Sequence, residues 1–249
     1  MKGVAPGLVE SLAAAVERAG LDLHGWSLGF ARVSPSILLV PAFGLRALPN
    51  PARIALGLAM GAALAPAVRP VADRSLPWAA ELLIELGRGL PVALSAAVVL
   101  FTATMAGSLV DDLRGSRDVA SVPSVEPGAT PSGVLVAMLV AIAFLEGGGP
   151  ARIVAALSDP QLEFSGPLQR AAADLTGGIE LAIAVGAPVI ATSIVVEVAS
   201  ALVSRAASPA HVMPLLAPLR SLVLLGAFAL VLERMVELLS LYATHSGIR

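Results

Sequence analysis

Charged residues inside apolar stretches are the first candidates for chemistry in this sequence. Glu81 and Glu85 lie one helical turn apart, and Arg88 follows on the same predicted helix face. Two carboxylates can act as an acid and a base, but a cation at this spacing favours an ion-pair cluster. A charged side chain costs about 2.5–3.5 kcal/mol at a bilayer centre, so these groups must contact protein or water.

A second polar feature lies in residues 186–209, an apolar stretch that carries Glu197. At 100° per residue, the predicted helix places four polar residues in one narrow stripe, with Gly186 in the same band: Ser193, Glu197, Ser200 and Ser204. Two interpretations stay open. The stripe is either a contact between helices of this chain or a surface that faces another subunit or a channel. Pro188 is predicted to remove one helical hydrogen bond and to kink the start of the helix.

Other patterns of chemistry are missing from the sequence. There is no cysteine, and His24, His211 and His245 lie too far apart for a metal motif. The run Gly147-Gly148-Gly149-Pro150 lacks the Lys-Ser/Thr of a phosphate-binding loop and predicts a helix break. The net charge of −2 comes without a basic run, which argues against nucleic acid. We therefore expect neither an enzyme nor a cofactor or metal site.

The composition indicates a membrane-associated protein. Of the 249 residues, 57% are hydrophobic and 14% are charged, whereas a soluble domain has about 25% charged residues. The mean hydropathy is +0.86. A spanning helix needs about 20 mostly apolar residues. About six stretches meet this criterion, near residues 26–44, 52–68, 78–110, 133–157, 178–204 and 212–242.

The stretches predict an all-α, membrane-associated bundle in a single domain, residues 1–249. Residues 8–19 form a shorter amphipathic pattern, and Glu10 and Glu17 make this end a poor signal peptide. The clearest break is the polar segment 111–131, in which Asp111 and Asp112 are expected to open a solvated loop. A second break is expected at residues 158–170.

Several features in order along the chain resemble one family. The series runs from Arg32 and Pro41-Ala42-Phe43-Gly44, through Pro49, Arg53 and Pro66, to Ala106-Gly107 with Asp111 and Gly115, Phe144 with its glycine cluster, Pro188, and Arg205 with Pro209. This series is similar to the FliR/SctT family of type III secretion export-gate proteins, shared by flagella and injectisomes. The resemblance covers about residues 26–240.

The resemblance implies a bundle of long, kinked helical hairpins that forms a channel and has no enzymatic activity. Members of the family assemble with FliP/SctR-like and FliQ/SctS-like subunits, and an FlhB/SctU-like gate subunit docks on the assembly. The assembly passes unfolded secreted proteins across the bacterial inner membrane, in which this chain would be a multi-pass protein. Much of the assembly is held above the bilayer plane, so the embedded charges would meet neighbouring helices.

The resemblance also suggests site residues. The expected assembly or pore-facing residues are Arg32, Gly107, Asp111, Gly147, Gly148, Pro188, Ser193, Glu197, Ser200, Ser204, Arg205 and Pro209. A loop that plugs the closed pore in the family falls at residues 115–122, with Gly115, Arg117, Asp118, Val119 and Val122. The family often places aromatic residues in this loop, and this chain has none there.

A different function would use the same charges in another way. A self-contained permease or proton-coupled transporter could pass protons along carboxylates in its apolar helices. The residues available for such a relay are Glu81, Glu146, Glu180 and Glu197. The partners of these carboxylates in the structure therefore bear on the choice between a channel subunit and a transporter.

Overall fold

The computed structural model describes residues 22–40, 50–68, 77–116, 118, 129–159, 165–207 and 213–245. These residues form seven α-helices and no strand, which confirms the all-α prediction. The helices are α2 (Leu23–Leu39), α3 (Asn50–Leu64), α4 (Trp78–Arg114), α5 (Pro131–Glu146), α6 (Gly149–Leu157), α7 (Ser165–Ala206) and α8 (Met213–His245).

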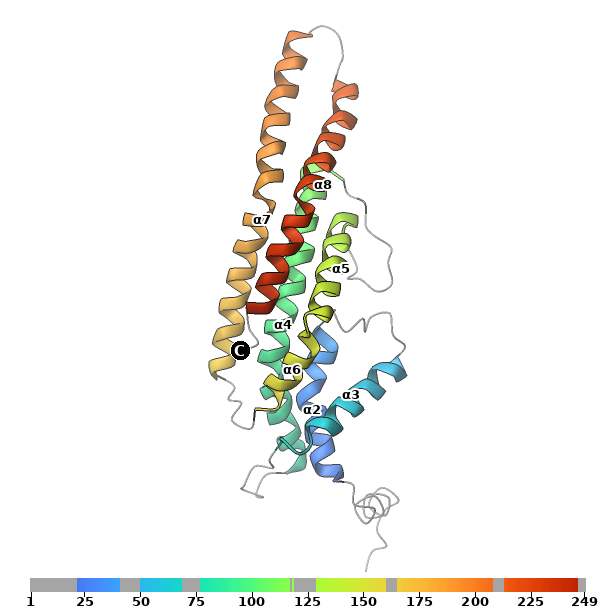
Figure 1. Cartoon of the computed structure of the whole chain (residues 1–249), viewed down its shortest axis with the longest axis vertical. Helices are drawn as coiled ribbons and strands as arrows, with labels where there is room; N and C mark the ends of the chain where they lie inside the picture. The colour runs from blue at the N-terminus through green and yellow to red at the C-terminus, as the bar shows by residue number, and fades with distance from the viewer. Residues whose placement is uncertain are drawn as a thin grey trace, which may run out of the picture.

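Helix α4 is the centre of the bundle. It contacts α2, α5, α6, α7 and α8, and it runs along the middle of the molecule between α7 and α5 (Figure 1). The helix ends at Gly115, which has a φ of 71°. The Gly115 and Ser116 N–H groups donate to the Asp112 and Asp111 carbonyl oxygens, both at 3.0 Å. This pattern is a Schellman motif, and glycine suits it because the left-handed conformation strains other residues.

The α5–α6 segment is one apolar stretch broken in two. Gly148 has a φ of 73°, Pro150 lies in the first turn of α6, and the two helices are bent by 66°. The Phe144 ring fills the inside of the bend, because a Cβ at Gly149 would lie 2.3 Å from Phe144 Cζ. The break predicted at the glycine run is therefore confirmed.

Helices α7 and α8 form a long antiparallel hairpin whose upper end projects beyond the other helices (Figure 1). Helix α7 has 42 residues and α8 has 33. Pro188 lies inside α7, as expected, but in the middle of this long helix and not near its start, where the kink was predicted. Residues 165–170, expected to belong to a break, are already helical. Near the other end of the hairpin, the Tyr242 hydroxyl donates to the Asp174 carbonyl oxygen at 2.7 Å.

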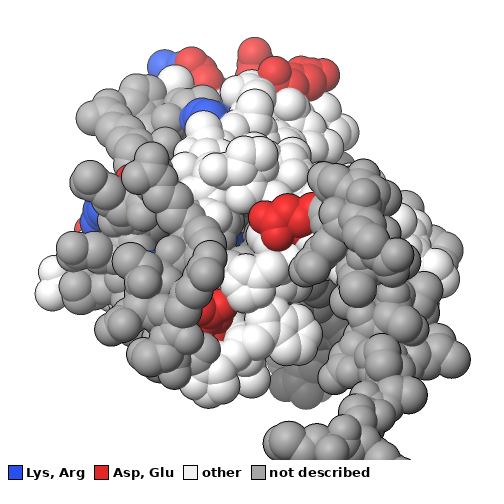
Figure 2. Space-filling view, turned by 90° about the horizontal axis from the view of Figure 1, so that it is seen from below, with Lys and Arg blue, Asp and Glu red and all other residues white. Residues whose placement is uncertain are grey.

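Fewer of the described helices than expected are both long enough and apolar enough to span a membrane. By length and composition, two of the described helices qualify: α4 and the Leu168–Ala206 part of α7. The bent pair α5–α6 would make a third. Helices α2 and α3 have 17 and 15 residues, fewer than a span of about 20 needs. Seen from below, uncharged side chains cover most of the described surface (Figure 2).

Close helix packing at Gly89 gives the first prediction. A Cβ at Gly89 would lie 1.9 Å from the Arg32 carbonyl oxygen, so α2 and α4 touch through their backbones here. We expect Gly89→Ala to force the helices apart at a cost of about 1–3 kcal/mol. The measurement is the thermal unfolding temperature of the purified protein.

The matched control for Gly89→Ala is Gly226→Ala on α8. A Cβ there meets nothing within 4 Å, so this change should be neutral or stabilise the helix by about 0.5–1 kcal/mol. Equal unfolding temperatures for the two variants would contradict the close α2–α4 contact.

Candidate functional site: polar junctions between helices

Arg32 is the centre of a buried polar cluster at the lower end of the bundle, which we call the Arg32 junction. The residue is 1% exposed. Its Nε and Nη2 atoms both lie 2.6 Å from Glu85 Oε2. Its Nη1 atom donates to the Leu157 and Asp159 carbonyl oxygens at 2.9 and 3.3 Å. The second Glu85 oxygen, Oε1, lies 2.7 Å from Arg88 Nη1.

The Arg32 junction joins three helices. Arg32 comes from α2 and Glu85 from α4, and the carbonyl oxygens are those of the end of α6 and the residues just after it. The last carbonyl groups of a helix have no partner within the helix, and a cation near them is favoured by the helix dipole. The guanidinium therefore satisfies both the buried Glu85 carboxylate and the C-terminal end of α6.

The predicted ion-pair cluster on α4 is confirmed for Glu85 and Arg88. Glu81, one turn earlier, lies 2.9 Å from His24 Nε2 of α2. Both carboxylates are buried, at 6% and 2% exposure. Each has its own basic partner, which favours a structural role over an acid/base pair.

A second polar cluster, the Asp111 junction, lies at the upper end of α4. Asp111 Oδ2 accepts a hydrogen bond from the Ser132 N–H at 2.8 Å. Its Oδ1 atom accepts from the Ser132 hydroxyl at 2.9 Å and from Arg114 Nη1 at 2.8 Å. Arg114 Nε in turn donates to the Ser221 hydroxyl of α8 at 3.0 Å. Helices α4, α5 and α8 are thus tied together.

Asp111 is 0% exposed, so the prediction that it opens a solvated loop was wrong. The carboxylate is stable there because three donors surround it and because a negative charge is favoured at the N-terminus of α5. Gly107 allows the close approach, since a Cβ at this position would lie 2.4 Å from the Ser132 carbonyl oxygen. Arg32, Gly107 and Asp111 all pack within this chain, and a role in assembly stays a prediction for them.

Glu197 also has a partner within the chain. Its Oε1 atom lies 2.5 Å from Arg220 Nη2 of α8, and the same Nη2 atom donates to the Leu113 carbonyl oxygen at 2.9 Å. The side chains are only partly covered, with 54% of Glu197 and 33% of Arg220 exposed. The pair therefore links α7 and α8 to the end of α4, with one side open.

The remaining predicted site residues lie in different surroundings. Of the α7 stripe, Ser193 is 3% exposed, whereas Ser200 and Ser204 are half-buried. Gly147 and Gly148 form the α5–α6 bend, and Pro188 and Arg205 are exposed on α7. Asp118 is exposed and accepts a hydrogen bond from the Ser116 hydroxyl. The others lie outside the described residues: Arg117, Val119, Val122 and Pro209.

Sequence reasoning missed the partners that complete these junctions. Ser132 follows the helix N-cap Thr130, but a capping pattern does not signal a bond to an aspartate 21 residues earlier. The Leu157 and Asp159 carbonyl groups carry no side-chain signal at all. Nothing in the sequence pairs Arg220 with Glu197, which lies 23 residues earlier. In the parts of the chain that the structure describes, no group of three or more His, Cys, Asp or Glu residues could hold a metal ion.

A double substitution tests the Arg32 junction. We expect Arg32→Met alone to destabilise the fold by about 3–5 kcal/mol, because it leaves Glu85 buried with only Arg88 beside it. Adding Glu85→Met should restore part of the loss, since replacing both charges is often neutral. The measurement is the amount and unfolding temperature of the folded protein. A double variant less stable than Arg32→Met would contradict the pairing.

Asp111 can be tested against its neighbour in the sequence. Asp111→Asn keeps the shape but places an amide N–H₂ against one of the donors, so we expect a loss of about 1–3 kcal/mol. The control is Asp112→Asn, because Asp112 is exposed and its change should stay within about 0.5 kcal/mol. Urea unfolding of both variants gives the comparison, and equal midpoints would exclude a structural role for the Asp111 contacts.

A scan of protein families identifies the chain. Residues 23–245 match the family described as bacterial export proteins, family 1. The match spans all seven described helices and both polar junctions. A comparison with curated proteins finds no match to the chain. Because the family covers nearly the whole sequence, the chain belongs to family 1 of the bacterial export proteins, the FliR/SctT family that its sequence resembles.

Proposed function

We propose that this protein is a structural, channel-forming subunit of a type III protein export gate, of the flagellar or injectisome kind. In this role it assembles with FliP/SctR-like and FliQ/SctS-like subunits and receives an FlhB/SctU-like gate subunit. The assembly passes unfolded proteins across the bacterial inner membrane. Membership of the export family supports a role in protein export. The exposed apolar side chains of α7, described next, support assembly with other subunits.

The uncovered face of α7 is the observation on which the proposal depends. Helices α4 and α7 are both strongly apolar. The mean hydropathy of the most apolar 18-residue segment is 1.9 in α4 and 2.2 in α7. The rest of the chain buries 67% of this segment in α4 but only 28% of the corresponding segment in α7. Exposed large side chains follow α7 along its length: Leu168, Leu175, Ile179, Ile183, Ile194, Val195, Val198, Leu202 and Val203.

The length of this face favours protein over lipid as its cover. From Leu168 to Val203 the helix rises about 53 Å, at 1.5 Å per residue. The hydrocarbon core of a bilayer is about 30 Å thick, so an upright α7 extends well beyond it. Apolar side chains outside the hydrocarbon need a protein partner to exclude water. A multi-subunit assembly held partly above the bilayer meets this need.

The partners of the carboxylates argue against the transporter alternative. Glu81, Glu85 and Glu197 each pair with a basic side chain of another helix. Glu146 and Glu180 are exposed on α5 and α7, respectively. A proton relay needs carboxylates that are free to exchange protons along a path, and three of these five are engaged by side chains of other helices.

A charge on the α7 face tests the assembly. We expect Val198→Arg to reduce recovery of the complex with the two smaller partner subunits by about tenfold or more, because a charge in a buried contact costs more than 1.4 kcal/mol. Val198 is 56% exposed in the chain alone, so its folding should not change. The measurement is affinity purification after co-expression, normalised to the amount of the chain in the membrane.

The control for Val198→Arg is Val198→Leu, which keeps an apolar side chain at the same exposed position. This variant should assemble as well as the wild type. If Val198→Arg also assembled normally, the α7 face would not be a subunit contact. A well-behaved wild-type monomer that gains no stability from the partners would overturn the proposed function as a whole.

The proposed plug loop has its own test. We expect deletion of residues 115–122 to raise ion leakage in cells that express the whole complex, because the segment would close the resting channel. The measurement is the membrane potential, or the growth defect at high external salt, at equal levels of assembled complex. Leakage equal to that of the intact complex would remove this loop from gating and leave the role of the subunit untouched.

A further inference from the structure

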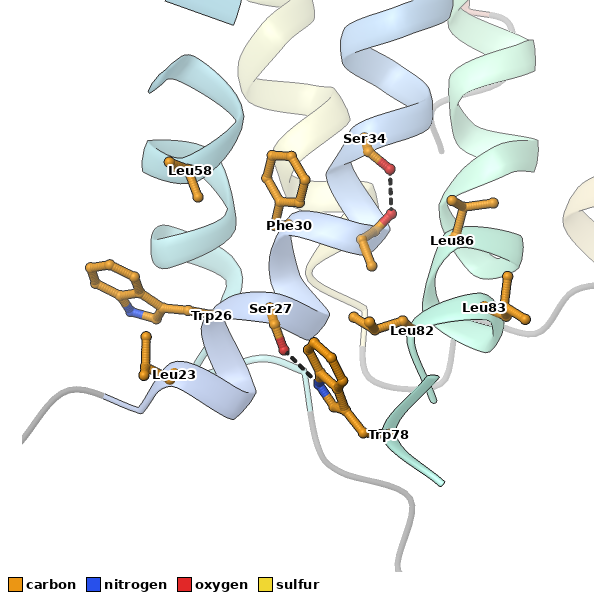
Figure 3. A pocket seen from close by; sticks show the side chains of 11 residues that line it. Leu23, Trp26, Ser27, Phe30, Ser34, Leu58, Trp78, Leu82, Leu83 and Leu86 are labelled. Carbon is orange, nitrogen blue, oxygen red and sulfur yellow. Dashed lines mark hydrogen bonds between the residues drawn. The ribbon is translucent and has the colours of Figure 1, made fainter. Parts of the chain in front are cut away.

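An apolar groove lies between α2, α3 and α4 at the lower end of the bundle (Figure 3). It has a volume of about 470 Å³. Helix α2 forms its floor, and α3 and α4 form its two sides. The large side chains around it are Trp26, Phe30, Leu58, Trp78, Leu82 and Leu86. The chain contains two tryptophans, and both line this groove.

The polar side chains of the groove already have partners. The Ser27 hydroxyl donates to the His24 carbonyl oxygen at 2.8 Å and accepts from Trp78 Nε1 at 3.1 Å. The Ser34 hydroxyl donates to the Ala31 carbonyl oxygen at 2.8 Å (Figure 3). With these hydrogen bonds made inside the chain, the groove offers a ligand apolar contact and little else. A hydrocarbon fits this lining better than a polar molecule.

The groove opens onto an exposed apolar surface. Leu58, Leu83 and Leu86 on its two sides are 48%, 69% and 42% exposed. Trp78 is 56% exposed and begins α4, a helix long and apolar enough to span a membrane. Tryptophan is enriched at the level of lipid headgroups. We therefore place the Trp78 end of the groove at the membrane interface and the Ser34–Leu86 end towards the hydrocarbon.

The size of the groove argues against a whole helix as its occupant. Leu23 and Ser34 mark its extent along α2, a rise of about 16 Å at 1.5 Å per residue. A helix of that length and of 10 Å diameter occupies roughly 1,300 Å³. All of the empty space in the groove, its open side included, is about 980 Å³, which is less than such a helix needs. A narrow, flexible chain fills it without moving α3 away from α4.

We propose that one acyl chain of a membrane phospholipid binds in this groove, with its headgroup beside Trp78. The bound chain packs against all three helices and fills the space between α3 and α4. This lipid site does not depend on the proposed function, because any membrane protein with this groove could hold a lipid. It adds a specific lipid contact near the Arg32 junction, which joins two of the same helices.

Photocrosslinking in the assembled complex tests the lipid site. The photoreactive residue p-benzoylphenylalanine replaces Leu86, and the complex is irradiated in native membranes before mass spectrometry of the chain. We expect adducts with the mass of a phospholipid. Adducts with a polypeptide, whether a partner subunit or this chain's own N-terminal residues, would overturn the proposal. This experiment needs no substitution other than the photoreactive residue at position 86.

A groove-filling variant tests whether the lipid binds at a defined site. Ser34→Leu places a larger side chain in the groove and should lower the phospholipid adduct at position 86 by about tenfold, equivalent to 1.4 kcal/mol of binding. The control is Ser240→Leu on α8, where the hydroxyl makes the same kind of bond, to the carbonyl oxygen of Glu237. The adduct should be unchanged in this control.

A second photoreactive position separates the groove from the general lipid surface. Leu238 on α8 is 43% exposed, nearly the same as Leu86. Any lipid adduct at position 238 should not respond to Ser34→Leu. If Ser34→Leu lowered neither adduct at equal amounts of complex, or both to the same degree, lipid would not occupy the groove specifically and the proposal would fail.

Discussion

The ion pair between Arg32 and Glu85 is the constraint on which the rest of the fold depends. Both side chains are almost fully buried in an apolar bundle, where an unpaired charge costs several kcal/mol. The pair therefore fixes the register of α2 on α4, and the bonds to the Leu157 and Asp159 carbonyl groups fix the end of α6. Asp111 acts in the same way about 39 Å further along α4, where it holds α5 and, through Arg114, α8. Between these two junctions α4 is packed by small apolar residues such as Ala93, Ala96, Ala97 and Ala103, each 0% exposed. Polar contacts at both ends thus orient the helices, and close apolar packing holds them together.

The sequence predicted the helices well and their polar contacts poorly, for a physical reason. Hydropathy and helix-breaking residues are local properties, so the apolar stretches and the bend at Gly148 could be located directly. The burial of Asp111 could not, because it depends on Ser132, which lies 21 residues later in the next helix. The partner of Glu197 depends on the register of the α7–α8 hairpin, which places Arg220 beside it. Glu85 and Arg88 are the exception, since residues three apart on a helix are neighbours whatever the tertiary fold.

Helices α4 and α7 show why composition alone does not distinguish a core helix from an assembly helix. Their most apolar segments have similar hydropathy, yet the chain covers the segment in α4 and leaves the segment in α7 largely exposed. The difference arises because α2, α5, α6, α7 and α8 all pack on α4. Helix α7 packs mainly on α4 and α8, and the upper end of the hairpin projects past the other helices (Figure 1). Only the arrangement of the whole chain reveals which apolar face still needs a cover.

The two ends of the molecule call for different surroundings. At the lower end, the groove beside Trp78 presents apolar side chains and hydroxyl groups that are already hydrogen-bonded, which suits the interior of a bilayer. On the hairpin, the half-exposed Glu197–Arg220 pair lies in a segment of α7 that also exposes Ile194, Val195 and Val198. Hydrocarbon alone would leave this ion pair poorly solvated, and water alone would leave the three apolar side chains uncovered. A protein partner can cover the apolar side chains and also hydrogen-bond to the pair. The uneven distribution of charge therefore favours lipid around the lower helices and neighbouring subunits around the hairpin.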